Sequence, residues 1–242
     1  MMIKSAIIQG LLCFFLLASG MAQANVQFDA SRVVFDDANR EQSFLLSNRN
    51  DYPVVVQAWV DDGALNSNAG FKGSPVITYP SIFKMDAHTN RSIRLINSAI
   101  GQKNAGTERL YWLNVQILSP KTGKELNTGK PELNVSLLLK FKLFYRPHAL
   151  KGPSSEALKS MRFSRVGSTQ DRLRISNPSP YYVTFNRLSD GDTPVLRDLM
   201  LPPGGSQELP LLAPLPASAS GLNYAVVDDS GLITQGSVSL TK

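Results

Sequence analysis

The feature that most constrains this chain is a long alternating stretch from Leu133 to Pro147, which reads LNVSLLLKFKLFYRP. Apolar residues occupy the odd positions as far as Phe141, and only Leu138 interrupts the polar even-numbered row. Since successive side chains of a β-strand point to opposite faces, the pattern predicts a strand with one continuous apolar row. At about twelve residues it exceeds the usual strand length of about 5–6. Pro147 cannot donate a ladder hydrogen bond, so the strand should end there.

The N-terminus has the pattern of a cleaved signal peptide. A short basic start precedes an apolar run at residues 7–18, and Ala22-Gln23-Ala24 supplies the small residues of a cleavage site. The run is too short for a spanning helix, which needs about 20 residues. We therefore predict that residues 1–24 are removed and that the protein is exported. The only cysteine, Cys13, lies in this segment, so the mature chain is expected to have no disulfide.

The composition is that of an ordinary globular protein, with 43% hydrophobic and 18% charged residues, and it can bury a core. The length suits one or two domains of about 100–150 residues each. The formal net charge is +6, but Lys and Arg are spread along the chain without a run of five or six. A solvated basic surface explains this distribution better than nucleic-acid binding does.

After the leader, the chain consists of short β-type runs separated by Gly, Pro, Asn and Asp, and no segment of helical length has a helical period. The spacing of about seven strands over about 120 residues is typical of an immunoglobulin-like sandwich. Trp59 is expected to be a buried core aromatic. The predicted strands before the long one are residues 26–35, 44–46, 54–60, 76–79, 81–85, 92–96 and 110–118.

A second, smaller sandwich is predicted after the long strand. Residues 147–154 contain two prolines and a glycine, a composition typical of an interdomain hinge. We therefore predict an N-terminal domain at 25–146 and a C-terminal domain at 155–242. The predicted fold is all-β, with two immunoglobulin-like domains. The predicted strands of the second domain are residues 172–176, 181–188, 223–228 and 232–240, the last two forming a closing hairpin.

Five segments, in order and at matching spacing, resemble the periplasmic pilus chaperones, the PapD-like family. The resemblance covers nearly all of the mature chain. It implies two immunoglobulin-like domains set at an angle, a periplasmic location and no catalysis. It also implies a chaperone that binds, folds and caps pilus subunits by donor-strand complementation and delivers them to an outer-membrane usher. The segments are SRVVFDDANREQSFLLSNRNDYPVVVQAWVDD at 31–62, PVITYPSIFKMDAHTNRSIRLI at 75–96, ERLYWLN at 108–114, KLFYRP at 142–147 and ISNPSPYYVTF at 175–185.

The resemblance implies that Arg32 and Lys142 bind the C-terminal carboxylate of a subunit in the cleft between the domains. A carboxylate held by a guanidinium and an ammonium makes charge-assisted hydrogen bonds, about twice as strong as neutral ones. The anchor would also fix the register, because a slip by one residue turns every side chain to the other face. The alternative is that these two residues are unrelated surface cations.

The resemblance likewise implies that Leu133, Val135 and Leu137 are donor-strand residues, which fill the groove of a subunit that lacks a strand. The alternative is a row that faces the chain's own core. Strict alternation places Leu137 and Lys142 on opposite faces, unless a bulge or a strong twist intervenes. A free edge of this kind would also invite self-association.

Glu108, Arg146 and Asp228 match a charged interdomain network in the family, which would hold the angle between the sandwiches. The alternative is three unrelated surface charges. The neighbouring Asp229 is a second candidate for the third position.

An enzyme is disfavoured. Ser81 and Lys84 form an S-x-x-K motif and residues 121–123 a K-T-G motif, as in β-lactam-binding enzymes. However, S-x-x-K needs a helix start, whereas Ser81 follows a proline in β-type sequence. His88 and His148 lack metal-site spacing. We expect no cofactor, metal or small-molecule substrate. The remaining rival is a secreted β-sandwich adhesin or carbohydrate-binding module, which would need exposed aromatics and no Arg/Lys pair.

Overall fold

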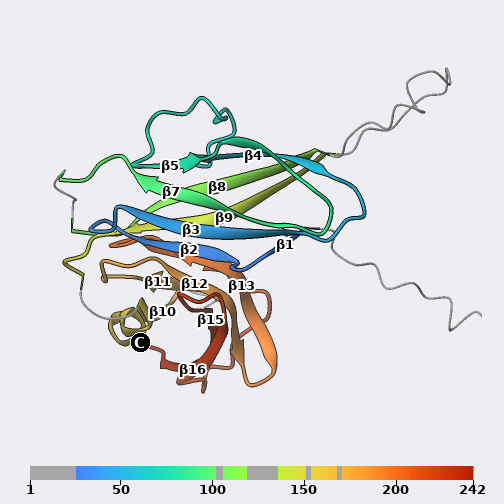
Figure 1. Ribbon diagram of the computed structural model, residues 1–242. Coiled ribbons are helices and arrows are strands. Elements are labelled where there is room, and N and C mark those ends of the chain that lie inside the picture. The colour runs from blue at the N-terminus through green and yellow to red at the C-terminus, as the bar shows by residue number, and fades with distance from the viewer. Residues whose placement is uncertain (1–25, 102–105, 119–135, 151–153, 168–170, 242) are drawn as a thin grey trace, which may run out of the picture.

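The protein folds as two β-sandwiches, seen in a computed structural model that describes residues 26–101, 106–118, 136–150, 154–167 and 171–241 (Figure 1). The predicted all-β fold with two immunoglobulin-like domains is confirmed. The predicted signal peptide lies outside the described residues. Within the described residues, no helix is long and apolar enough to cross a membrane.

The N-terminal sandwich packs a four-stranded sheet, in the order β1-β3-β7-β5, on a five-stranded sheet, in the order β2-β9-β8-β4-β6. Neighbouring strands are antiparallel, except that β2 pairs with β9 in parallel. The strands are β1 Val26–Phe28, β2 Arg32–Asp36, β3 Glu41–Asn48, β4 Val54–Asp61, β5 Val76–Tyr79, β6 Ile82–Met85, β7 Asn90–Asn97, β8 Arg109–Leu118 and β9 Ser136–Arg146.

The stretch at 26–35, predicted as one strand, is divided between the two sheets. β1 pairs with β3 in one sheet, and β2 pairs with residues 142–146 of β9 in the other. The chain crosses between the sheets at residues 29–31, where the Asp29 carboxylate accepts a hydrogen bond from the Leu45 amide. Because β2 covers only the last residues of β9, residues 136–141 are paired with β8 alone among the described strands.

Alternation along the strands determines the core. β9 buries Leu143 and Tyr145, and the Tyr145 ring stacks on Phe35 at 6.0 Å between centroids. The prediction that Trp59 lies in the core is wrong. Ala58 and Val60, the neighbours of Trp59 in β4, are buried in the core, so the alternation turns Trp59 to the other face, where it is half-buried.

The C-terminal sandwich packs a three-stranded sheet, β10-β11-β14, on a four-stranded sheet, β13-β12-β15-β16. The sequence did not indicate β10, β13 and β14, nor the 3-10 helix η1, whose only buried residue is Ala157. Figure 1 shows this sandwich beside the end of β9. Its elements are η1 Ser154–Ser160, β10 Arg162–Val166, β11 Arg172–Ser176, β12 Val183–Asp190, β13 Thr193–Leu201, β14 Ser206–Pro210, β15 Gly221–Val227 and β16 Ile233–Ser239.

Candidate functional site

Arg146, the last residue of β9, joins the two domains. Its Nε donates to Glu108 Oε1 at 2.6 Å, and its Nη1 and Nη2 donate to the two carboxylate oxygens of Asp229 at 2.7 and 2.8 Å. The guanidinium also lies 5.1 Å from the centre of the Tyr181 ring. One cation thus bridges a carboxylate of each domain, with the paired geometry that favours arginine over lysine.

The prediction that Asp228 is the third member of this network is wrong, because Asp229 occupies that position. Asp228 Oδ1 instead accepts hydrogen bonds from the Ser230 amide, the Ser230 hydroxyl and the Leu232 amide. It therefore closes the turn between β15 and β16, while the next residue points toward Arg146. Asp229 also accepts a hydrogen bond from the Ser154 hydroxyl at 2.6 Å.

Burial and charge oppose one another in this network. Glu108 is 3% exposed, and burial raises its pKa despite the nearby Arg146 and the Tyr182 amide, which donates to Glu108 Oε2 at 2.7 Å. Burial also raises the pKa of Asp229, but the hydrogen bonds from Arg146 and Ser154 outweigh it and leave that pKa lowered. The network therefore depends on Arg146 remaining in place, since it compensates a buried carboxylate.

An imidazole pairs with an acid next to this network. His148 Nδ1 lies 2.9 Å from Asp36 Oδ2, and the His148 amide donates to Asp37 Oδ1 at 2.8 Å. The hydrogen bond to Asp36 and the charge of its carboxylate raise the pKa of His148. The pair ties the chain after β9 to the end of β2.

Replacing Asp36 with asparagine is expected to lower the pKa of His148 toward its ordinary value, because the stabilising negative charge is lost. A pKa that is raised in the folded state stabilises the protein below the ordinary pKa of histidine, and this stabilisation is lost as the pH rises through the raised value. An NMR titration of the His148 ring measures the shift. The control, Asp192→Asn in the C-terminal domain, should leave this titration unchanged. An unaltered titration in Asp36→Asn would contradict the prediction.

Arg32 and Lys142 lie side by side, because Arg32 begins β2 and is the direct register partner of Lys142 on β9. The Arg32 guanidinium lies 5.8 Å from the centre of the Phe144 ring, which in turn contacts the Tyr182 ring at 5.7 Å. Arg32 Nη1 also donates to the Val227 carbonyl at 3.3 Å. Phe144 and the Arg32 guanidinium therefore lie against the C-terminal domain, so the two cations lie where the domains meet.

This pair of cations is partly desolvated, and the acids that act on it, Asp228 and Asp229 on Arg32 and Asp198 on Lys142, do so without forming an ion pair. Burial lowers the pKa of both Arg32 and Lys142, and the charge of Arg32 lowers that of Lys142 further. Among the described residues, neither forms an ion pair within 4.0 Å. Arg32 Nε is buried and has no hydrogen-bond partner there. Two half-buried positive charges with an unused donor form a site suited to an anion.

The adjoining part of β9, at residues 136–141, has an edge that is free of any other described strand, and it carries an apolar row. Leu137 is 50% exposed, while Leu139 and Phe141, further along the same row, pack against the core. The register of β8 with β9 is constant from Ser136 to Tyr145, so no bulge intervenes, and Leu137 and Lys142 lie on opposite faces. Leu133 and Val135, the other two predicted donor residues, lie outside the described residues.

The S-x-x-K motif does not begin a helix. Ser81 precedes β6, and Lys84, within that strand, pairs with Asp86 at 2.8 Å. Residues 121–123, the K-T-G motif, lie outside the described residues. In the described part of the chain, no group of three or more His, Cys, Asp or Glu side chains could hold a metal ion.

The fold and this site define a binding protein of two immunoglobulin-like sandwiches, with an open strand edge that leads to a pair of cations. Comparison with known proteins gives the family. Residues 25–151 match the model of the pili and flagellar-assembly chaperone, PapD N-terminal domain, and residues 156–238 match that of the pili assembly chaperone PapD, C-terminal domain. The chain belongs to the PapD-like family of pilus-assembly chaperones.

Individual relatives support this family assignment. The chain is 32% identical over 231 residues to the probable fimbrial chaperone LpfB of Escherichia coli O157:H7, which covers 95% of this chain and 94% of LpfB. It is 27% identical over 235 residues to the chaperone protein FimC of Escherichia coli K12, and the match covers 96% of this chain and 91% of FimC. The crystal structure of the E. coli chaperone DraB superposes with a TM-score of 0.72 at 27% identity, covering 89% and 96%. A structure of the Salmonella enterica SafA pilin in complex with the SafB chaperone has the same fold, with a TM-score of 0.74 at 23% identity, covering 91% and 99%.

Proposed function

We propose that this protein captures pilus subunits in the periplasm by adding its β9 strand to them, with Arg32 and Lys142 anchoring the C-terminal carboxylate of the subunit. The observation that carries the proposal is that the free edge of β9, at residues 136–141, ends at these two cations. The name of the SafA–SafB complex, a pilin with its chaperone, supports pilus subunits as partners.

The position of β2 determines how a subunit strand would lie. β2 occupies the edge of β9 from Lys142 onward, so a strand added at residues 136–141 would continue the line of β2 and stop at Arg32. If its last residue places a carboxylate between Arg32 and Lys142, the added strand runs in the same direction as β9. β2 itself pairs with β9 in parallel, so the sheet already accommodates this geometry.

The side chains of β9 would complete the subunit. Strand addition supplies affinity through the main chain, and alternate side chains supply specificity by filling pockets. Leu137 continues the row of Leu139 and Phe141 beyond the part that is packed against the core. We therefore infer that Leu137, with Leu133 and Val135 before it, occupies the interior of an incomplete subunit.

In the free protein, the Val227 carbonyl accepts a hydrogen bond from Arg32 that the subunit carboxylate would accept in the complex. The hydrogen bond from Arg32 to this carbonyl is long, at 3.3 Å, and a neutral acceptor compensates a guanidinium only weakly. A carboxylate would gain two charge-assisted partners and would satisfy the buried Arg32 Nε. Capture would therefore exchange a weak contact for a strong one.

The family consists of chaperones and not of enzymes, and the proposed mechanism needs no covalent chemistry or cofactor. We propose that the complex is delivered to an outer-membrane usher, and that the predicted signal peptide directs the chain to the periplasm. The comparisons do not favour the rival, an adhesin or carbohydrate-binding module.

Replacing Leu137 with aspartate is expected to weaken capture of a pilus subunit roughly tenfold or more, because burial of a leucine contributes about 1.5–3 kcal/mol. The matched control is Leu138→Asp. Leu138 is similarly exposed, at 45% against 50%, but lies on the opposite face of β9. Co-purification of the subunit after co-expression measures the difference. Equal losses in both variants would contradict the insertion of the odd-numbered row.

A further inference from the structure

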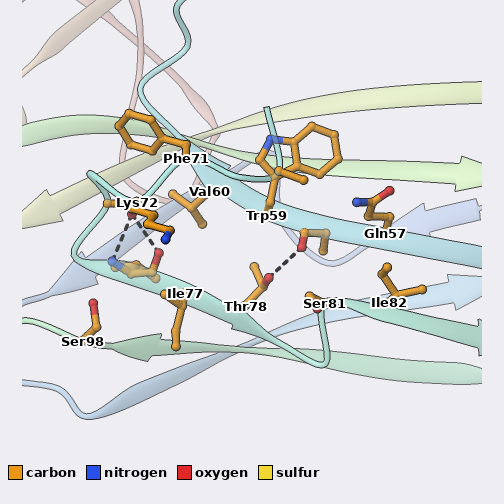
Figure 2. A pocket seen from close by; sticks show the side chains of 14 residues that line it. Gln57, Trp59, Val60, Phe71, Lys72, Ile77, Thr78, Ser81, Ile82 and Ser98 are labelled. Atoms are coloured by element: carbon orange, nitrogen blue, oxygen red, sulfur yellow. Dashed lines mark hydrogen bonds between the residues drawn. The ribbon is translucent and has the colours of Figure 1, made fainter. Parts of the chain in front are cut away.

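The N-terminal sandwich has a cavity of about 510 Å³ away from the subunit-binding edge. It lies between β4, β5 and the loop that joins them, as Figure 2 shows. In the five-stranded sheet β4 and β6 are at the end opposite β2, so the cavity is separate from Arg32, Lys142 and the free edge of β9. Its volume is within the range of about 300–1,000 Å³ that is common for small-molecule sites.

Two aromatic residues, Trp59 and Phe71, line this cavity. Trp59 projects from β4, and its Nε1 donates to Asp61 Oδ2 at 2.9 Å. Asp61 is 1% exposed and also accepts a hydrogen bond from the Gly63 amide at 2.9 Å. Phe71 comes from the loop, and its ring lies so close to Gly73 that a Cβ there would clash with it. Trp59 is therefore a fixed apolar wall, and Phe71 supplies a second apolar wall from the loop.

The polar groups of the cavity are mostly used to hold its walls. The Thr78 hydroxyl donates to the Ala58 carbonyl at 2.7 Å and so joins β5 to β4. The Ser98 hydroxyl donates to the Pro75 carbonyl at 3.0 Å. Lys72, next to Phe71 on the loop (Figure 2), is different. It is the only charged side chain among the described residues that line the cavity, and in that part of the chain it forms no ion pair within 4.0 Å.

We propose that this cavity binds a small planar aromatic anion, with its ring against Trp59 and Phe71 and its negative group toward Lys72. Flat aromatic surfaces attract another ring by offset stacking or edge contacts. The exposed ammonium of Lys72 adds a preference for a carboxylate or a related anion. The proposal is independent of subunit capture, because none of the three residues belongs to the cleft or to β9.

The chain contains two tryptophans, which gives the experiment an internal control. Trp59 lines the cavity, whereas Trp112 packs against Gly63 and is not one of its lining residues. The full mature chain is titrated with naphthalene-2-carboxylate and, separately, with the uncharged naphthalene-2-methanol. The two indole N–H signals are followed in ¹H–¹⁵N spectra. We expect the Trp59 signal to shift to saturation with the carboxylate, while the Trp112 signal stays in place.

Variants separate the ring contribution from the charge contribution. Phe71→Ala should weaken both probes, because one wall is lost. Lys72→Gln should weaken only the carboxylate, roughly two- to fivefold, as expected for an exposed ion pair. Lys159→Gln, in the C-terminal domain, should change neither. A linear shift without saturation, equal shifts of both indoles, or an unchanged carboxylate affinity in Lys72→Gln would overturn the proposal.

Discussion

Alanine at Arg32 is expected to abolish stable capture of pilus subunits while the fold is retained. Removing one partner of a buried, hydrogen-bonded charge pair costs about 2–5 kcal/mol, so binding should weaken at least about 30-fold. Lys142→Ala should have a similar effect, because the same carboxylate would lose its second cation. Co-purification with a co-expressed subunit, followed by titration of the purified components, measures the loss.

The fold should tolerate these changes because neither cation forms an ion pair with another described residue in the free protein. Arg32 makes one long hydrogen bond to the Val227 carbonyl. Its burial lowers its pKa and so disfavours the charged form of the guanidinium. Thermal unfolding should therefore change little. Arg32→Lys keeps the charge but lacks the planar donor set, so it should restore only part of the affinity. Arg40→Ala, an exposed arginine after β2, is the matched control. Subunit binding by Arg32→Ala at wild-type strength would refute the anchor.

Methionine at Arg146 is expected to destabilise the protein by about 3–5 kcal/mol, because it leaves the buried Glu108 carboxylate without its counterion. The Arg146→Met/Glu108→Gln double variant should recover part of this loss, since the buried charge is then gone. Urea denaturation measures the stability, and small-angle scattering measures whether the two domains keep their arrangement. If Arg146→Met unfolded in urea with the stability of the wild-type protein, the network would be dispensable for stability.

The two neighbouring aspartates provide the control for this network. Asp229→Asn should destabilise the protein more than Asp228→Asn, because only Asp229 pairs with Arg146 and asparagine retains the acceptor that Asp228 uses in its turn. The pKa of Asp229 is lowered in the folded state, so its contribution is present above its ordinary pKa and lost as the pH falls through the lowered value. This loss of stability at low pH should be absent in Asp229→Asn.

The long strand was predictable because its signal is local. Alternation alone places Leu143 and Tyr145 in the core and predicts the end of β9 before Pro147. The division of residues 26–35 was not predictable in this way. The two halves share one β-type pattern, and only tertiary pairing decides that β1 joins β3 while β2 joins β9. β13 escaped prediction because its buried residues do not alternate, and its pairing with β12 shifts register.

The site was predicted in part. The residues of the cation pair and of the network came from the resemblance, since single charges carry no local signal for tertiary contacts. Asp228 and Asp229 are adjacent acids in one turn, and only the geometry of that turn decides which one reaches Arg146. The error at Trp59 was avoidable, because Val54, Val56, Ala58 and Val60 already form a continuous apolar row in β4. The prediction instead followed the buried aromatic that a strand at this place in an immunoglobulin-like sandwich often carries.

If a subunit strand is added along β9 as proposed, the start of β2 at Arg32 would be a physical stop for it. A bound chain cannot run past this point without displacing β2. One surplus residue would therefore push the chain back by one position and turn its alternate side chains away from its own interior. Binding would thus depend on the position of the C-terminus of the polypeptide and not on its sequence. Chains that are cut short or extended would be rejected by length alone, before they reach a growing fibre.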